Sequence, residues 1–229
     1  ENGPRSGTQE ATERVALSNP GITLRYLHDP TPGLLAGRHR GAREAHGEIL
    51  VFADDDIDAS PDWLASIVDT FFDPDVQLVG GRSLPRFELL PPMWIDGYWY
   101  TPPYGGRACV QLSLLDLAEK PLTIDANYVW GLNFAIGGGT LFELGGFHPD
   151  NVPDHLQHFQ GDGETGLTMK ANEAGLRAVY QPKALIHHRI PAARLTLTYF
   201  KRRAFYQGVC DSFTTIRREP GCLAVPASS

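Results

Sequence analysis

The order of the hydrophobic patterns predicts an α/β fold, a single domain with a mixed, mostly parallel central sheet flanked by helices. Residues 49–53 (Ile-Leu-Val-Phe-Ala) form a continuous apolar run, typical of a strand buried on both faces of a parallel sheet. An amphipathic helix follows, with an apolar stripe of Leu64, Ile67, Val68 and Phe71. Residues 76–80 return to a strand pattern. Strand, helix and strand in this order indicate helices packed on a sheet.

The other elements follow from the same periodicities. We expect further helices over residues 8–17, 34–45, 140–144, 163–174 and 194–207, and further strands over residues 22–27, 178–180 and 184–186. Ser60 and Pro61 suit the N-cap and first position of the helix that contains Leu64. Residues 85–106 are rich in proline, glycine and aromatic residues, which predicts a long irregular segment. We therefore expect one domain over residues 1–218 and a disordered tail over residues 219–229.

Composition narrows the class of function. The chain has 229 residues and a net charge of -7, which argues against a nucleic-acid backbone as the main partner. The three cysteines, Cys109, Cys210 and Cys222, are widely spaced and odd in number, so they indicate neither a zinc site nor a disulfide framework. No apolar run is long enough to span a bilayer and no secretory leader is visible. We expect a cytoplasmic protein.

Three consecutive aspartates, Asp54, Asp55 and Asp56, follow the apolar run directly. Ligands of open α/β sheets bind at the carboxyl ends of strands, and Mg²⁺ or Mn²⁺ prefers hard oxygen ligands completed by substrate phosphates. We expect Asp54 and Asp56 to face one side and hold such a cation. A solvated loop that caps the next helix is the plainer alternative.

Two other known motifs would include the same aspartates. A calcium loop fits Asp54, Asp56 and Asp58 but fails at Ala59 and Ala65, where glycine and glutamate are needed. A phosphatase with Asp54 as its nucleophile also fits locally, so this alternative stays open.

Several segments, taken in order, resemble the family 2 glycosyltransferases, which adopt the GT-A fold. The first part of the resemblance is Gly33 to Ala42, where His39 replaces the usual asparagine, followed by Gly47-Glu48 and the run that ends in Asp54-Asp55-Asp56. The later parts are residues 61–64, Asn133-Phe134-Ala135-Ile136, Leu144-Gly145-Gly146-Phe147, Gly161-Asp162-Gly163-Glu164 and residues 175–188. The segments span almost the whole chain.

The resemblance implies transfer of a sugar, with inversion, from a nucleotide-diphosphate donor to the hydroxyl group of a carbohydrate, lipid-linked or small-molecule acceptor. Asp56 would bind Mn²⁺ or Mg²⁺, with Asp54 and Asp55 near the donor. His188, or less favourably His187, would complete the metal site; ordinary strand-end histidines are as good an interpretation. Arg38 would contact the nucleotide; the alternative is an arginine exposed on the surface of a helix.

The resemblance also implies a catalytic base that deprotonates the acceptor. Counting back from Gly175 places Glu164 at that position. The family's usual Glu-Asp pair is here Asp162-Gly163-Glu164, so Asp162 competes with Glu164 for the role. The alternative is that both carboxylates only favour the N-terminus of the following helix electrostatically.

The turn-forming residues 1–8 resemble the end of the family's second strand, so we expect the first strand, helix and second strand to be missing from this sequence. That segment normally holds much of the nucleotide base pocket. Its true absence would favour an inactive, GT-A-like nucleotide-sugar-binding protein.

Two further surfaces are visible in the sequence. Trp94, Tyr98, Trp99 and Trp130 could form a stacking floor for an acceptor sugar, although packing among themselves is favoured. A basic stretch contains Arg189, Arg194, Lys201, Arg202 and Arg203. It would cover the diphosphate or make a peripheral contact with anionic lipid, and a solvated helix face is the common alternative.

Overall fold

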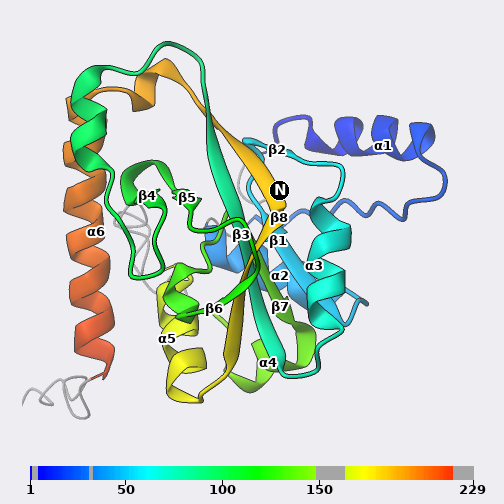
Figure 1. Ribbon diagram of the computed structural model, residues 1–229. Coiled ribbons are helices and arrows are strands. Elements are labelled where there is room, and N and C mark those ends of the chain that lie inside the picture. The colour runs from blue at the N-terminus through cyan, green and yellow to red at the C-terminus, as the bar shows by residue number, and fades with distance from the viewer. Residues whose placement is uncertain (2–4, 31–32, 148–162, 219–229) are drawn as a thin grey trace, which may run out of the picture.

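A twisted sheet runs through the middle of the molecule, with helices packed around it (Figure 1). The computed structural model describes residues 1, 5–30, 33–147 and 163–218. The helices are α1 (Thr8–Ser18), α2 (Leu34–Glu44), α3 (Trp63–Phe71), α4 (Gly138–Glu143), α5 (Thr165–Glu173) and α6 (Leu197–Arg218). The strands are β1 (Ile49–Ala53), β2 (Ile57–Ala59), β3 (Val76–Phe87), β4 (Arg107–Cys109), β5 (Leu114–Asp116), β6 (Leu122–Ile124), β7 (Asn133–Gly137) and β8 (Arg177–Ile190). Short 3₁₀ helices are η1 (Met93–Tyr98), η2 (Val110–Leu112), η3 (Ala126–Tyr128) and η5 (Ala192–Arg194).

The sheet has the order β1-β7-β3-β5-β4, and β8 pairs with β3 as well as with β2 and β6. The expected mixed sheet is present, but a mostly parallel one is not. Among the described strands, only β3 and β8 pair in parallel, and the other pairs are antiparallel. The apolar run at residues 49–53 does not specify the direction of the neighbouring strand.

The pairing and burial of strand β1 also differ from the expectation. It pairs antiparallel with β7, from Ile49 opposite Gly137 to Ala53 opposite Asn133, and with no other described strand. Of its five residues only Leu50 is buried. The predicted strand exists, but the expectation that it is buried on both faces of a parallel sheet is wrong.

Strand lengths also differ from the expectation. Residues 22–27 belong to no strand, whereas β3 continues seven residues beyond the predicted end at 80, to Phe87. The two strands expected at 178–180 and 184–186 are one strand, β8. Long pairing between β3 and β8, with an irregularity between Gly81 and Ser83, supplies the hydrogen bonds that hold both strands extended.

The helices lie close to where their patterns place them. Helix α3 begins at Trp63 with Asp62 as its N-cap, so Ser60 and Pro61 do not have the predicted positions. Its buried face contains Ile67, while Leu64 and Val68 are exposed. Helix α6 begins three residues later than expected and continues to Arg218, and its first turn packs against η1 through Phe200 and Trp94.

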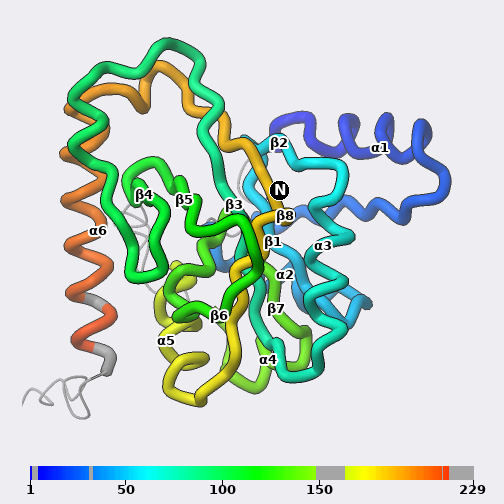
Figure 2. Tube along the Cα trace, in the orientation of Figure 1, coloured from blue at the N-terminus to red at the C-terminus, as the bar shows by residue number. Residues whose placement is uncertain are grey.

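Three buried clusters hold these layers together. The largest lies between the sheet and helices α2, α4 and α5, around Phe134 and Tyr180. A second surrounds Phe200 of α6 and Ile95 of η1, and a third lies under α3 around Ile67. Figure 2 shows β3 and β8 side by side through the centre, with α6 along one side. No helix among the described residues is long and apolar enough to cross a membrane.

Candidate active site

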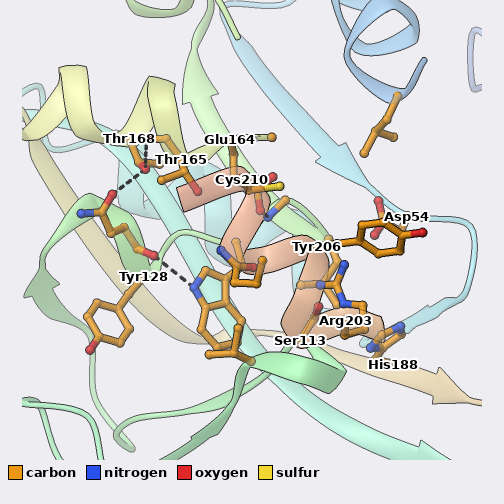
Figure 3. Close-up of a pocket in the computed structure, with 18 of the residues that line it drawn as sticks. Asp54, Ser113, Tyr128, Glu164, Thr165, Thr168, His188, Arg203, Tyr206 and Cys210 are labelled. Carbon is orange, nitrogen blue, oxygen red and sulfur yellow. Dashed lines mark hydrogen bonds between the residues drawn. The ribbon is translucent and has the colours of Figure 1, made fainter. Parts of the chain in front are cut away.

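A cavity of about 630 Å³ opens where β1 ends, between η3, the start of α5 and helix α6. Its polar lining includes Arg38, Asp54, Asp56, Ser113, Asn127, Glu164, Thr165, Thr168, His188, Arg194 and Arg203, and its aromatic lining Tyr100, Tyr128, Trp130, Tyr199 and Tyr206. Figure 3 shows Asp54 and His188 toward one side and Thr165 and Thr168 toward the other, with side chains of α6 between them. Segments far apart in the sequence thus form one polar site.

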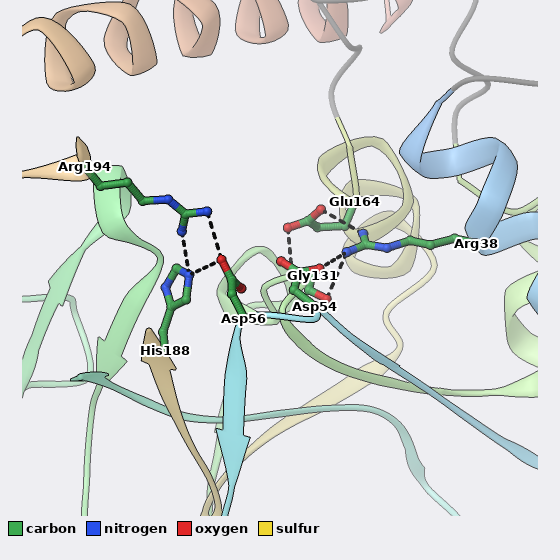
Figure 4. A network of polar contacts seen from close by, with 7 residues as sticks. All are labelled: Arg38, Asp54, Asp56, Gly131, Glu164, His188 and Arg194. Carbon is green, nitrogen blue, oxygen red and sulfur yellow. Dashed lines mark hydrogen bonds and ion pairs between the residues drawn. The ribbon is translucent and has the colours of Figure 1, made fainter. Parts of the chain in front are cut away.

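Asp56, His188 and Arg194 form the first of two polar networks (Figure 4). The Arg194 guanidinium donates to Asp56 Oδ2 and to His188 Nε2, both at 2.8 Å. His188 is buried, and its Nδ1 lies 2.8 Å from the carbonyl oxygen of Leu112. Because a carbonyl only accepts, Nδ1 donates to Leu112, and Nε2 accepts the hydrogen bond from Arg194.

Arg38 joins the second network, shown on the right of Figure 4. Its guanidinium donates to Asp54 at 3.2 Å, to Glu164 at 3.5 Å and to the Gly131 carbonyl at 3.0 Å. The other Glu164 oxygen accepts from the Gly131 amide at 2.7 Å. Glu164 lies just before α5, where Gly131 and Arg38 orient its carboxylate into the cavity.

The carboxylates are concentrated enough to disturb one another. Burial raises the pKa of Asp54, and the neighbouring carboxylates Asp56 and Glu164 raise it further, while Arg38 opposes the shift. A group of acids that is costly to ionise together favours a cation, because added positive charge stabilises all the carboxylates at once.

A divalent cation fits part of this site. Asp56 Oδ1 is buried without a hydrogen-bond partner. His188 Nε2 lies 3.3 Å from Oδ2 of the same carboxylate, and both of these atoms accept from Arg194. Carboxylate oxygen and imidazole nitrogen both suit Mn²⁺. Over the ranges that the structure describes, no three His, Cys, Asp or Glu residues gather as a metal site. Water and substrate phosphates would supply the remaining ligands.

The structure brings most of the predicted site residues together. Arg38, Asp54, Asp56, Glu164 and His188 all line the cavity. Asp55 is exposed and does not line it, so the expectation that it binds the donor has no support from the geometry. His187 pairs with Asp58 across β2 and β8 and alternates to the other face. Asp162 lies outside the described residues.

Arg194 and the backbone of Gly131 are the functional groups that the sequence did not single out. Arg194 appeared only as one of several basic residues, and nothing local distinguishes a cation that contacts Asp56 across the fold. Trp94 and Tyr98 pack on each other and on Phe200, as self-packing predicts, whereas the guanidinium of Arg107 stacks over Trp99. Trp130 alone of the four predicted aromatics lines the cavity.

The sequence is similar to one known family. A family model described as glycosyl transferase family 2 matches residues 1–114. A glucosyl-dolichyl phosphate glucuronosyltransferase from Haloferax volcanii is 25% identical over 207 residues, which are 88% of this chain and 63% of that relative. The chain therefore spans less than two thirds of the length of this curated relative.

Solved structures identify the fold. GalNAc-T7 with UDP, GalNAc and Mn²⁺ superposes with a TM-score of 0.56 at 17% identity, over 99% of this chain and 44% of that one. The mannosyltransferase PcManGT from Pyrobaculum calidifontis, with GDP-Man and Mn²⁺, gives 0.55 at 21% identity, over 94% and 53%. Both are GT-A proteins, so the predicted GT-A fold is confirmed.

Proposed function

We propose that the chain is a family 2 glycosyltransferase that transfers a sugar from a nucleotide-diphosphate donor to an acceptor hydroxyl group, with inversion at the anomeric carbon. The observation that carries the proposal is the meeting of Asp54, Asp56, Glu164 and His188, from three separate parts of the sequence, in one cavity. The cavity is large enough for a drug-sized ligand.

Asp56 and His188 are the proposed ligands of a divalent cation, Mn²⁺ or Mg²⁺. Asp54 lines the same cavity and would lie near the donor or the water ligands of the cation. When bound, such a cation would neutralise charge on the departing diphosphate. Two related folds were solved with Mn²⁺ and a nucleotide or nucleotide sugar, which supports this assignment. Arg38 and Arg194 bring further positive charge to the same cavity.

Glu164 is the proposed base. Its carboxylate takes the proton of the acceptor hydroxyl as the acceptor oxygen bonds to the anomeric carbon, and the bond from that carbon to the diphosphate breaks. The Gly131 amide and Arg38 hold the carboxylate in one orientation before the acceptor arrives. Such positioning lowers the entropic cost of the reaction.

The acceptor is the least determined partner. The Haloferax relative is named for a dolichyl phosphate substrate, so a lipid-linked acceptor is our first candidate, ahead of a free carbohydrate or small molecule. A peripheral membrane contact would suit such an acceptor. The cytoplasmic location expected from the cysteines stays a prediction.

Calorimetric titration with UDP-, GDP- and dTDP-sugars in the presence of Mn²⁺ tests donor binding, and hydrolysis of the bound sugar nucleotide tests turnover. We expect Glu164→Gln to bind the donor normally and to lose about 10²- to 10⁴-fold in turnover. Glu143→Gln, an exposed glutamate of α4 outside the cavity, is the matched control.

Three results would contradict parts of the proposal. Full turnover in Glu164→Gln with loss in Asp162→Asn would move the base to Asp162. Tight donor binding without any turnover would indicate an inactive binding protein. Turnover of a phosphate ester without nucleotide-sugar binding would indicate a phosphatase that uses Asp54.

A further inference from the structure

An exposed apolar tip lies at one end of the molecule, formed by Leu89, Leu90, Met93 and Leu197. Leu90 and Met93 are 93% and 89% exposed, and Leu89 and Leu197 are 60% and 50% exposed. Single exposed apolar residues are common on protein surfaces, whereas a group of them marks a site of interaction with a protein, a ligand or a membrane. Figure 1 shows the loop after β3, η1 and the start of α6 together at the top of the molecule.

The apolar tip rests on a base held by hydrogen bonds and ring packing. The Glu88 amide donates to the Ile190 carbonyl at 3.0 Å, and the Glu88 carboxylate accepts from the Ala192 amide at 2.7 Å. These two bonds join the ends of β3 and β8. Next to Met93, the ring of Trp94 lies 5.0 Å from that of Phe200, which is 1% exposed. The fold therefore holds the exposed side chains outward instead of folding them in.

Two exposed cations lie close to the apolar tip, although the chain carries a net charge of -7. Lys201 and Arg202 are exposed on the first turns of α6, directly after Phe200. The other charged groups at this end are Arg86 and Arg189, which share Asp58, Glu88, which is bonded to Ala192, and the exposed Asp96.

We propose that the apolar tip inserts into the interfacial layer of a bilayer that contains anionic lipids, with Lys201 and Arg202 at the level of the headgroups. Leu89, Leu90, Met93 and Leu197 are all at least half exposed, and such side chains can enter a deformable lipid surface. Apolar side chains flanked by cations are the general pattern of interfacial binding.

The position of the apolar tip relates the proposed membrane contact to the catalytic cavity. Arg194 and Tyr199, which flank Leu197 in sequence, both line the catalytic cavity. A chain docked through the tip would therefore hold this wall of the cavity near the headgroups, where a lipid-linked hydroxyl or phosphate is presented. The docking itself depends only on the tip, and would stand if the proposed transfer reaction failed.

Sedimentation of the purified protein with vesicles tests the proposal directly. One set of vesicles is phosphatidylcholine alone, and the other contains 30% phosphatidylglycerol. We expect the protein to sediment with the anionic vesicles and far less with the neutral ones. Leu90→Asp/Met93→Asp should lower the partition coefficient at least about tenfold, because two apolar insertions are lost.

A matched control separates the apolar tip from general surface hydrophobicity. Leu17 and Phe72 are 85% and 78% exposed and lie on α1 and after α3, away from the tip. Leu17→Asp/Phe72→Asp should sediment like the original protein. Lys201→Glu and Arg202→Glu should each weaken binding to anionic vesicles about fivefold, and neither should alter binding to neutral ones.

Circular dichroism of each variant establishes that it is folded, as expected for substitutions at exposed positions. The proposal is overturned if the original protein sediments with neither kind of vesicle, or if Leu90→Asp/Met93→Asp sediments as well as the original. It is also overturned if gel filtration shows that the original protein is a dimer and this variant a monomer, because the apolar tip would then be covered by a second copy.

Discussion

Arg38 is the side chain that allows Asp54 and Glu164 to lie together at the cavity. Its side chain is 9% exposed, and it contacts both carboxylates as well as the Gly131 carbonyl. A mostly buried cation with three oxygen partners is needed to offset the repulsion between the two acids. A role in structure therefore accompanies the proposed contact of Arg38 with the nucleotide.

We expect Arg38→Ala to lower the free energy of unfolding by about 1–2 kcal/mol, since two partly buried carboxylates lose their partner and both are still reached by water. Urea denaturation followed by circular dichroism measures the change. Arg40→Ala, which removes an exposed ion pair with Glu44 on the same helix, should change it by less than about 0.5 kcal/mol. Equal effects of the two substitutions would show that Arg38 is not a structural bridge.

His188 and His187 are adjacent in sequence, and we expect only His188 to bind the metal. His188 directs Nε2 into the cavity beside Asp56, whereas His187 lies on the other face of β8. We expect His188→Ala to weaken Mn²⁺ binding at least about tenfold and His187→Ala to leave it unchanged. The increase in Tm with added Mn²⁺ measures binding without any substrate. An undiminished increase in His188→Ala would remove this residue from the metal site.

At the scale of elements, the pairing of β3 with β8 depends on Gly81. A side chain there would overlap the carbonyl oxygen of Ala184 and the amide of Asn133. That Asn133 amide donates to Ala184 at 2.8 Å, and its oxygen accepts from the Trp63 indole at 2.9 Å. The absence of a side chain at Gly81 thus lets β3, β7, β8 and α3 approach one another.

Gly81→Ala should destabilise the protein by about 1–3 kcal/mol or more, because backbone atoms and a buried amide have to move. Gly41→Ala is the matched control on α2, where the new methyl group meets no atom within 4 Å. In a helix interior that change is expected to stabilise by about 0.5–1 kcal/mol. Thermal denaturation of the two variants should give shifts of opposite sign, and shifts of the same sign would contradict this account.

At the scale of the whole molecule, α6 is held by a cluster of its own. Phe200, buried against Trp94 and Tyr98, belongs to a hydrophobic cluster separate from the main core. The same helix contributes Tyr199, Arg203, Tyr206 and Cys210 to the cavity wall. The shape of the site therefore depends on a contact made some distance from its carboxylates.

Phe200→Ala should cost about 3–4 kcal/mol and should loosen α6 and η1 before the sheet. Amide hydrogen exchange checks this, with faster exchange expected in α6 than in β3. Phe205→Ala, on the same helix but 62% exposed, should leave both quantities nearly unchanged. Uniformly faster exchange throughout the Phe200→Ala protein would show that α6 is part of the main core.

The sequence by itself determined the features that depend on neighbours along the chain. The strand at 49–53, the aspartates after it and the helix around Ile67 follow from the residues and the hydrophobic periodicity along the chain. Their existence could therefore be predicted. The order of the family's segments also pointed to Asp54, Asp56, Glu164 and His188, all of which line the cavity.

Only the tertiary structure decided what depends on contacts between distant segments. Residues 22–27 alternate like a strand but have no partner in the sheet, and the antiparallel pairing of β1 with β7 leaves no trace in either sequence. Arg194 is one arginine among several until the fold places it 2.8 Å from Asp56. Strand direction and long-range ion pairs depend on the interaction between two distant segments. The residue pattern along one segment therefore does not specify them.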